Sequence, residues 1–207
     1  MDRTAFLKLL STLLYPTLRG EGFKGSGTTL RRHDGHFHHI FHVQGSTSAS
    51  GCYINLGAHL DFLPAEGGGT FSPNDFGEPS CSFRVRLQSR GGERWSYGDF
   101  EAAARATIQE MIGAWATQGH AFFERFASAK EADNLERLIR DLEGPAVHPY
   151  RALVGARITA YVGDNRRALR IALSAVERVG ERATGLLVSL NDFIRTTREK
   201  ETVVVKL

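Results

Sequence analysis

Cysteine is scarce in this sequence: Cys52 and Cys81 are the only two among 207 residues. Two cysteines without a Cys-x-x-Cys pairing exclude a disulfide framework and suit a reducing cytosol. No apolar run reaches the roughly 18 to 20 residues that a membrane-spanning helix requires. A leader peptide is not expected either, because Asp2 stands where a basic region belongs and Lys8 interrupts the apolar run. We therefore expect a cytoplasmic protein with no membrane partner.

No single sign of charge dominates the chain, and its composition is that of a folded protein. The net charge is +3, and 42% of the residues are hydrophobic, which excludes a disordered chain. With 207 residues the chain can bury a core in one domain or slightly more. The small positive charge permits a polyanionic partner without requiring one.

Glycine separates two parts of the sequence. Most of the 22 glycines precede residue 101, whereas alanine and arginine become denser after it. We therefore expect sheet and turns first and helices second. A helix is predicted before the sheet, because apolar residues recur at helical spacing in residues 5–14 and Pro16 interrupts the pattern. Either Asp2 or Thr4 is available to cap it.

Short runs of β-type residues bounded by Gly, Ser, Asp or Pro predict a four-stranded antiparallel meander. The strands are expected at residues 28–33, 37–44, 52–60 and 82–87. Asp34-Gly35 is a hairpin signal between the first two, because glycine accepts a positive φ. In the second strand, alternation assigns every other residue to the core. These residues are Phe37, His39, Phe41 and Val43.

From residue 99 the pattern is helical, with one apolar stripe over about 27 residues. The stripe consists of Phe100, Ala104, Ile108, Met111, Ile112, Trp115, Phe122, Phe123 and Phe126. A polar helix is expected at residues 130–142, and Gly144-Pro145 ends it. Segments 151–162 and 166–179 predict a helical hairpin, with Asp164 or Asn165 as a cap.

A last helix at residues 181–198 and a β-prone tail at residues 202–205 complete the chain. The predicted fold class is therefore α+β: an N-terminal helix, a four-stranded antiparallel sheet, a long helix packed on it and a C-terminal helical hairpin or bundle. We expect residues 1–127 to form an α+β domain. Residues 128–207 are predicted to be a helical extension packed on that domain, without a core of its own.

Five of the eight histidines lie within ten residues, at positions 33, 36, 38, 39 and 42. Neutral imidazole is a common ligand of transition metals. Along one strand, however, His38 and His42 lie about 13 Å apart at roughly 3.3 Å per residue, too far to share one ion. A site at His36 and His38 would need a carboxylate from elsewhere, such as Asp34 or Asp61. We therefore predict no metal site and no cofactor.

The sequence carries no catalytic signature that we can identify. It has no Gly-x-Ser-x-Gly elbow, and neither cysteine has the basic context of an activated thiolate. The glycines of residues 66–70 resemble a phosphate cradle, but no Gly-Lys-Ser/Thr ends the segment. Four carboxylates share one loop of unknown conformation, so no acid–base pair can be assigned. They are Asp61, Glu66, Asp75 and Glu78.

Arginine is the residue type that most suggests a binding surface. Arg84 and Arg86 alternate onto one face of the fourth strand, and Arg31-Arg32 lie on a strand of the same sheet. Solvated arginines at a sheet edge have the same spacing. Aromatic residues are not interleaved on that face as platforms for bases would be, so nucleic acid is a disfavoured partner.

The long segment of residues 64–80 combines three consecutive glycines with Phe71 and Phe76. A phenylalanine on such a loop either folds back onto the sheet or is presented to a partner. The following strand can supply a polar rim around such an anchor. If a protein partner exists, we expect it to contact four residues. They are Phe71, Phe76, Arg84 and Arg86.

A series of short landmarks resembles the bacterial domain-of-unknown-function family 4304 over about residues 4–125. The landmarks are Leu13-Leu14, Leu18, Gly22-Phe23-Lys24, Gln44, Asn55-Leu56-Gly57, Cys81, Arg86-Leu87 and Trp95. The resemblance implies an α+β unit, a cytosolic origin and no catalytic residues to transfer. Among the landmarks, we expect Gly57 to allow a bulge or a close approach of the backbone. An inward-facing Asn55 would need a hydrogen-bond partner, for which Gln44 on the adjacent strand is suited.

Two classes of function remain. The first is a noncatalytic bacterial protein-binding module, such as an immunity or antitoxin protein that binds a toxin. The alternative is a small hydrolase or a nucleic-acid-acting enzyme with an unrecognised site. We favour the first class, and so expect a protein partner and no enzymatic activity.

Overall fold

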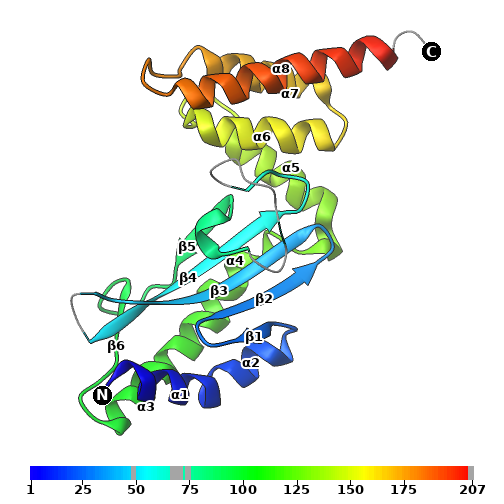
Figure 1. The fold of residues 1–207 in the computed structure, drawn as a ribbon. Coiled ribbons are helices and arrows are strands. Elements are labelled where there is room, and N and C mark those ends of the chain that lie inside the picture. Colours follow the sequence, from blue (N-terminus) through cyan, green and yellow to red (C-terminus); the bar gives the residue numbers. More distant parts are fainter. Residues whose placement is uncertain (48–49, 66–71, 73–75, 205–207) are drawn as a thin grey trace. The chain divides into compact units, whose positions relative to one another are not determined.

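A computed structural model describes residues 1–47, 50–65, 72 and 76–204 (Figure 1). The chain divides into two compact units, Met1–Ala129 and Lys130–Leu207. The first unit combines helices with an antiparallel sheet and the second is helical, so the α+β class is confirmed. Whether the second unit depends on the first for its stability stays a prediction. Among the described residues, no helix is long and apolar enough to cross a membrane.

Within the described residues of the first unit, six strands form an antiparallel sheet in the order β1-β2-β3-β4-β5, with β6 paired to β4. Their bounds are β1 Lys24–Ser26, β2 Thr29–Asp34, β3 Phe37–Gly45, β4 Gly51–Leu60, β5 Phe83–Arg86 and β6 Arg94–Ser96. The four predicted strands correspond to β2, β3, β4 and β5. The other two, β1 and β6, have three residues each, which is too short for alternation to reveal them.

One face of the sheet is the core face. The alternate residues predicted to point inward from β3, Phe37, His39, Phe41 and Val43, are all buried. Helices α1 (Arg3–Leu13) and α2 (Tyr15–Gly20) precede the sheet. The Tyr15 ring meets the Phe41 ring edge-on, with 6.3 Å between centroids. Asp2 caps α1 by accepting a hydrogen bond from the Ala5 amide at 2.8 Å, and Pro16 lies in the first turn of α2.

The opposite face is here called the outer face. The strand register assigns to it Arg31 and His33 of β2, His38, Ile40, His42 and Gln44 of β3, Tyr53, Asn55, Gly57 and His59 of β4, and Arg84 and Arg86 of β5. The 3-10 helix Glu78–Ser80 lies in the segment between β4 and β5. It leads to Cys81, which contacts Phe76 and Ile40 in a buried cluster.

The helical segment after the sheet is interrupted by a π-helical turn. It consists of α3 (Glu101–Ala114), the π-helical turn Trp115–Gly119 and α4 (His120–Glu124). The apolar stripe is confirmed at Ala104, Ile108, Met111, Trp115, Phe123 and Phe126, which are buried. It is wrong at Phe100, which is 64% exposed because it lies before the first turn of α3.

The second unit contains four helices within its described residues. They are α5 (Glu131–Leu142), α6 (Pro149–Tyr161), α7 (Asn165–Val176) and α8 (Thr184–Val204), and the 3-10 helix Ser128–Lys130 precedes them. The predicted hairpin corresponds to α6 and α7, and Asp164 caps α7 by accepting from the Arg167 amide at 2.9 Å. The predicted β-prone tail is wrong for residues 202–204, which continue α8.

Candidate functional site

A polar network on the outer face links three neighbouring strands. The Asn55 amide nitrogen donates to the Gln44 side-chain oxygen at 2.8 Å, which confirms the predicted pair across β3 and β4. The Asn55 side-chain oxygen in turn accepts from Nε of Arg86 on β5 at 3.0 Å. Both polar ends of the Asn55 amide are therefore satisfied, although the residue is only 3% exposed.

Arg86 is held on two further sides. Its NH1 donates to the Glu93 carboxylate at 2.8 Å, and its guanidinium carbon lies 4.6 Å from the centre of the Tyr53 ring. The hydrogen bond from Arg86 lowers the pKa of Glu93. The Arg86 side chain nevertheless remains 41% exposed. The outer face thus presents a guanidinium that is fixed in position and accessible to solvent.

The predicted partner-binding residues have different environments. Arg84 and Arg86 are exposed on the same face of β5, separated by Val85, as predicted. Phe76 is 4% exposed, and its ring lies 4.6 Å from the His59 ring, so it folds back onto the sheet. Phe71 lies outside the described residues. The network around Arg86 therefore contains Gln44, Asn55, Tyr53 and Glu93. The sequence had indicated only Gln44 and Asn55, and only as a structural pair.

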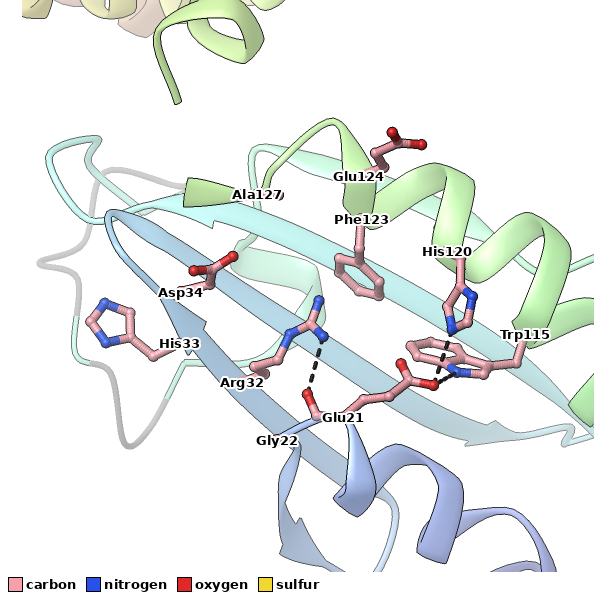
Figure 2. A pocket seen from close by; sticks show the side chains of 10 residues that line it. All are labelled: Glu21, Gly22, Arg32, His33, Asp34, Trp115, His120, Phe123, Glu124 and Ala127. Carbon is pink, nitrogen blue, oxygen red and sulfur yellow. Dashed lines mark hydrogen bonds and ion pairs between the residues drawn. The ribbon is translucent and has the colours of Figure 1, made fainter. Parts of the chain in front are cut away.

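A pocket of about 530 Å³ lies between β2, the end of α2, the π-helical turn and α4 (Figure 2). It is lined by Glu21, Gly22, Arg32, His33, Asp34, Trp115, His120, Phe123, Glu124 and Ala127. Arg32 points into it, with its guanidinium carbon 4.8 Å from the Phe23 ring centre and 5.7 Å from that of Phe123. Its Nε donates to His39 at 3.0 Å and its NH1 to the Glu21 carbonyl at 3.1 Å. Burial lowers the pKa of Arg32.

A carboxylate and a histidine lie side by side in the same pocket. Glu21 Oε1 accepts from the Trp115 indole at 2.9 Å and lies 3.0 Å from Nε2 of His120 (Figure 2). On the other side of Arg32, Asp34 accepts hydrogen bonds from the Ser128 amide and hydroxyl. Burial acts to raise the pKa of Asp34, but the hydrogen bonds from Ser128 and the charge of Arg32 together lower this pKa overall.

This pocket combines a cation that can bind anions with a histidine that a carboxylate orients, an arrangement of the kind that enzymes use for general-base catalysis. None of the described residues that line it is a serine, threonine or cysteine. Sequence reasoning missed the pair because Glu21 and His120 are almost a hundred residues apart in the chain. Only the packing of the helices on the sheet brings them together.

The clustered histidines occupy both faces of the sheet. His39 is fully buried on the core face, where its Nε2 donates to the Phe126 carbonyl at 2.8 Å, and burial lowers its pKa to about 3. On the outer face, burial lowers the pKa of His59 and of His38 to about 4. His33 and His38 lie directly opposite each other on β2 and β3, with their rings stacked at 4.3 Å between centroids.

Asp61 is near this stacked pair. One donor atom from each of His33, His38 and Asp61 lies within 4.8 Å of the other two. The prediction of no metal site rested on the distance between histidines along one strand and on the need for a carboxylate from elsewhere, such as Asp61. The absence of a metal site stays a prediction, but the pairing of β2 with β3 and the position of Asp61 now place three possible ligands close together.

The chain was compared with known proteins. A family model described as a domain of unknown function (DUF4304) matches residues 14–125. No curated protein and no solved structure matches the chain.

Proposed function

The chain belongs to the DUF4304 family of domains of unknown function, and from its residues we propose that it is a noncatalytic protein-binding module. We assign it to the cytoplasmic immunity or antitoxin proteins of bacteria, each of which binds a toxin partner. The observation that carries the proposal is the fixed, exposed guanidinium of Arg86 on the outer face.

Arginine and tyrosine are the residue types that most often dominate the free energy of protein association. Arg86 and Tyr53 are in contact here, and Asn55 and Glu93 hold the guanidinium in place. An interface pays an entropic cost for each flexible side chain that it immobilises. Three neighbours already restrain Arg86 in the unbound protein. Its side chain therefore loses less conformational entropy when a partner binds.

The charge of this surface indicates the chemistry of the partner. Arg84, Arg86 and Arg94 are exposed on β5 and β6, which both pair with β4, and Glu93 forms an ion pair with Arg86. An acidic surface on the partner complements this arrangement. Nucleic acid is less suited, because the Arg86 guanidinium already occupies one face of the Tyr53 ring and would compete with a base for it.

The test is a charge reversal at the surface. The partner is sought as the product of a toxin-like reading frame beside the gene, and the dissociation constant is measured by calorimetry. We expect Arg84→Glu with Arg86→Glu to weaken binding by at least about 2 kcal/mol, or roughly 30-fold. The matched control is Arg166→Glu with Arg170→Glu, which reverses two exposed arginines on α7. Unchanged affinity in the first variant, or equal loss in the control, would contradict the proposal.

A small hydrolase is the second candidate, and the pair of Glu21 and His120 beside Arg32 is the observation that favours it. An enzyme of this kind would lose activity on replacement of His120 by glutamine and keep it after charge reversal at Arg84 and Arg86. Hydrolysis of generic carboxylic and phosphoric esters by the purified protein, lost in His120→Gln, would replace the binding proposal with this one.

A further inference from the structure

The hairpin between β2 and β3 places two imidazoles on the outer face at the end of the sheet. His33 and His38 are directly opposite in the register, so their side chains leave the sheet on the same side. Asp61 directly follows β4, whose His59 is opposite His38. Three strands thus contribute three possible metal-binding side chains at one end of the sheet.

Asp61 is held beside the hairpin by two separate contacts with His36. Its backbone amide donates to the His36 carbonyl at 3.0 Å, and its carboxylate accepts from His36 Nδ1 at 3.0 Å. Outer contacts of this kind orient the ligands of metal sites. The position of the carboxylate is therefore built into the fold.

The geometry points to a binding site for one divalent transition-metal ion, with His33, His38 and Asp61 as its ligands. Two imidazoles and a carboxylate are a ligand set of zinc sites that have three protein ligands and keep one position open. The same set with further open positions suits iron(II). Calcium and magnesium prefer oxygen ligands alone, so we expect zinc to bind in preference to either.

The side chains must move slightly to share one ion. Ligand atoms about 2.0 to 2.1 Å from zinc are about 3.4 Å apart in a tetrahedron, whereas the three here lie within 4.8 Å. The rings of His33 and His38 are stacked with an angle of 22° between their planes, so each must turn to direct a nitrogen at the ion. The outer torsion of histidine has a broad energy minimum, which allows such a turn. His33 is exposed and is free to make it without repacking the core.

His33, His38 and Asp61 all line a pocket of about 880 Å³, which leaves room for a further ligand on a bound ion. Lys24 and Arg31 also line this pocket, and Arg31 Nε donates to the Phe76 carbonyl at 2.9 Å. Positive charge lowers the affinity for a bare cation but favours an anion as the fourth ligand of a bound ion. The site is therefore suited to a metal ion that carries a carboxylate or phosphate group.

The experiment measures zinc binding to the full-length chain after removal of metal by a chelator. Calorimetric titration with zinc chloride is expected to give one ion per chain, and titration with cobalt(II) an absorption spectrum typical of four-coordinate cobalt. Loss of an outer contact typically costs 10- to 100-fold in metal affinity. We expect His33→Ala, His38→Ala and Asp61→Asn each to weaken binding by more than about 100-fold.

The matched control is His42→Ala, because His42 lies on the same face of β3 and bonds to Thr29 outside the cluster. It is expected to keep the affinity of the unmodified chain. Circular dichroism on heating checks that each variant is folded, and His33→Ala keeps the test decisive because that residue is exposed. The inference is overturned if no zinc binds, if binding survives His33→Ala in a folded chain, or if His42→Ala weakens it equally.

Discussion

Gly57 in β4 leaves room for Cys81, and this contact gives a quantitative test of the packing on the outer face. A Cβ atom at residue 57 would lie 2.5 Å from Cys81 Sγ and 3.1 Å from Cys81 Cβ. The first distance is far below van der Waals contact, and Cys81 is fully buried. Forcing an additional methyl group into a packed interior costs about 1 to 3 kcal/mol. We expect Gly57→Ala to lower the free energy of unfolding by that amount.

Urea denaturation measures this loss, and a second substitution identifies its cause. Cys81→Ala removes the sulfur that the new methyl group would meet. The double variant should therefore be more stable than the sum of the single effects predicts, by at least about 1 kcal/mol. Gly113→Ala is the control: apart from its chain neighbours and the backbone of its own helix, no atom lies within 4 Å of the Cβ added at this exposed residue. A gain in stability of about 1 kcal/mol is therefore expected. Additive effects at Gly57 and Cys81 would refute the reasoning.

Stability should also fall in acid, because burial lowers the pKa of His39 to about 3 and that of His59 to about 4. In the unfolded chain both histidines take up a proton below about pH 6.5, whereas in the folded chain they remain neutral to a much lower pH. The folded state is therefore destabilised relative to the unfolded state as the pH falls below about 6.5. Between pH 7 and pH 5 each of the two histidines should lower the free energy of unfolding by about 2 kcal/mol. Urea unfolding in the presence of a chelator measures this loss, and a free energy of unfolding that does not change over this range would contradict it. For the domains, we expect a fragment of residues 1–127 not to unfold cooperatively, since the helical extension is predicted to pack on it. A stable fragment with a sharp calorimetric transition would show that the two units fold independently.

Local patterns predicted most of the fold. Alternation in β3 identified its core face, because one residue in two must leave a strand on the same side. Helices α1 and α7 each had two predicted capping candidates, and the ones that act are Asp2 and Asp164, whose carboxylates accept from backbone amides three residues later. The same logic failed at Phe100, whose apolar side chain fits the helical period but lies outside the helix.

The candidate sites were harder to predict because their residues are neighbours only across strands or layers. The pair of Gln44 and Asn55 was predictable, since both are polar and lie on adjacent strands. Arg86 joins them because β5 pairs with β4 in a register that places it opposite Asn55. A segment of more than twenty residues separates those strands, and no pattern in the sequence determines the register across it.

The stacked pair of His33 and His38 shows why the register of a hairpin cannot be predicted from the hydrophobic pattern alone. A two-residue loop at Asp34-Gly35 would pair His33 with His36, whereas the observed register pairs it with His38 and leaves Gly35-His36 as the loop. The two registers differ by two residues along β3, so every side chain keeps its face in both, and the alternation of apolar residues does not distinguish them. The conformation of the turn determines which of the two registers forms. In the observed register Asp34 is opposite Phe37 and binds Ser128, and Gly35 has a φ of +60°. A metal site formed by His33, His38 and Asp61 therefore depends on the loop, and insertion of one residue there should abolish zinc binding.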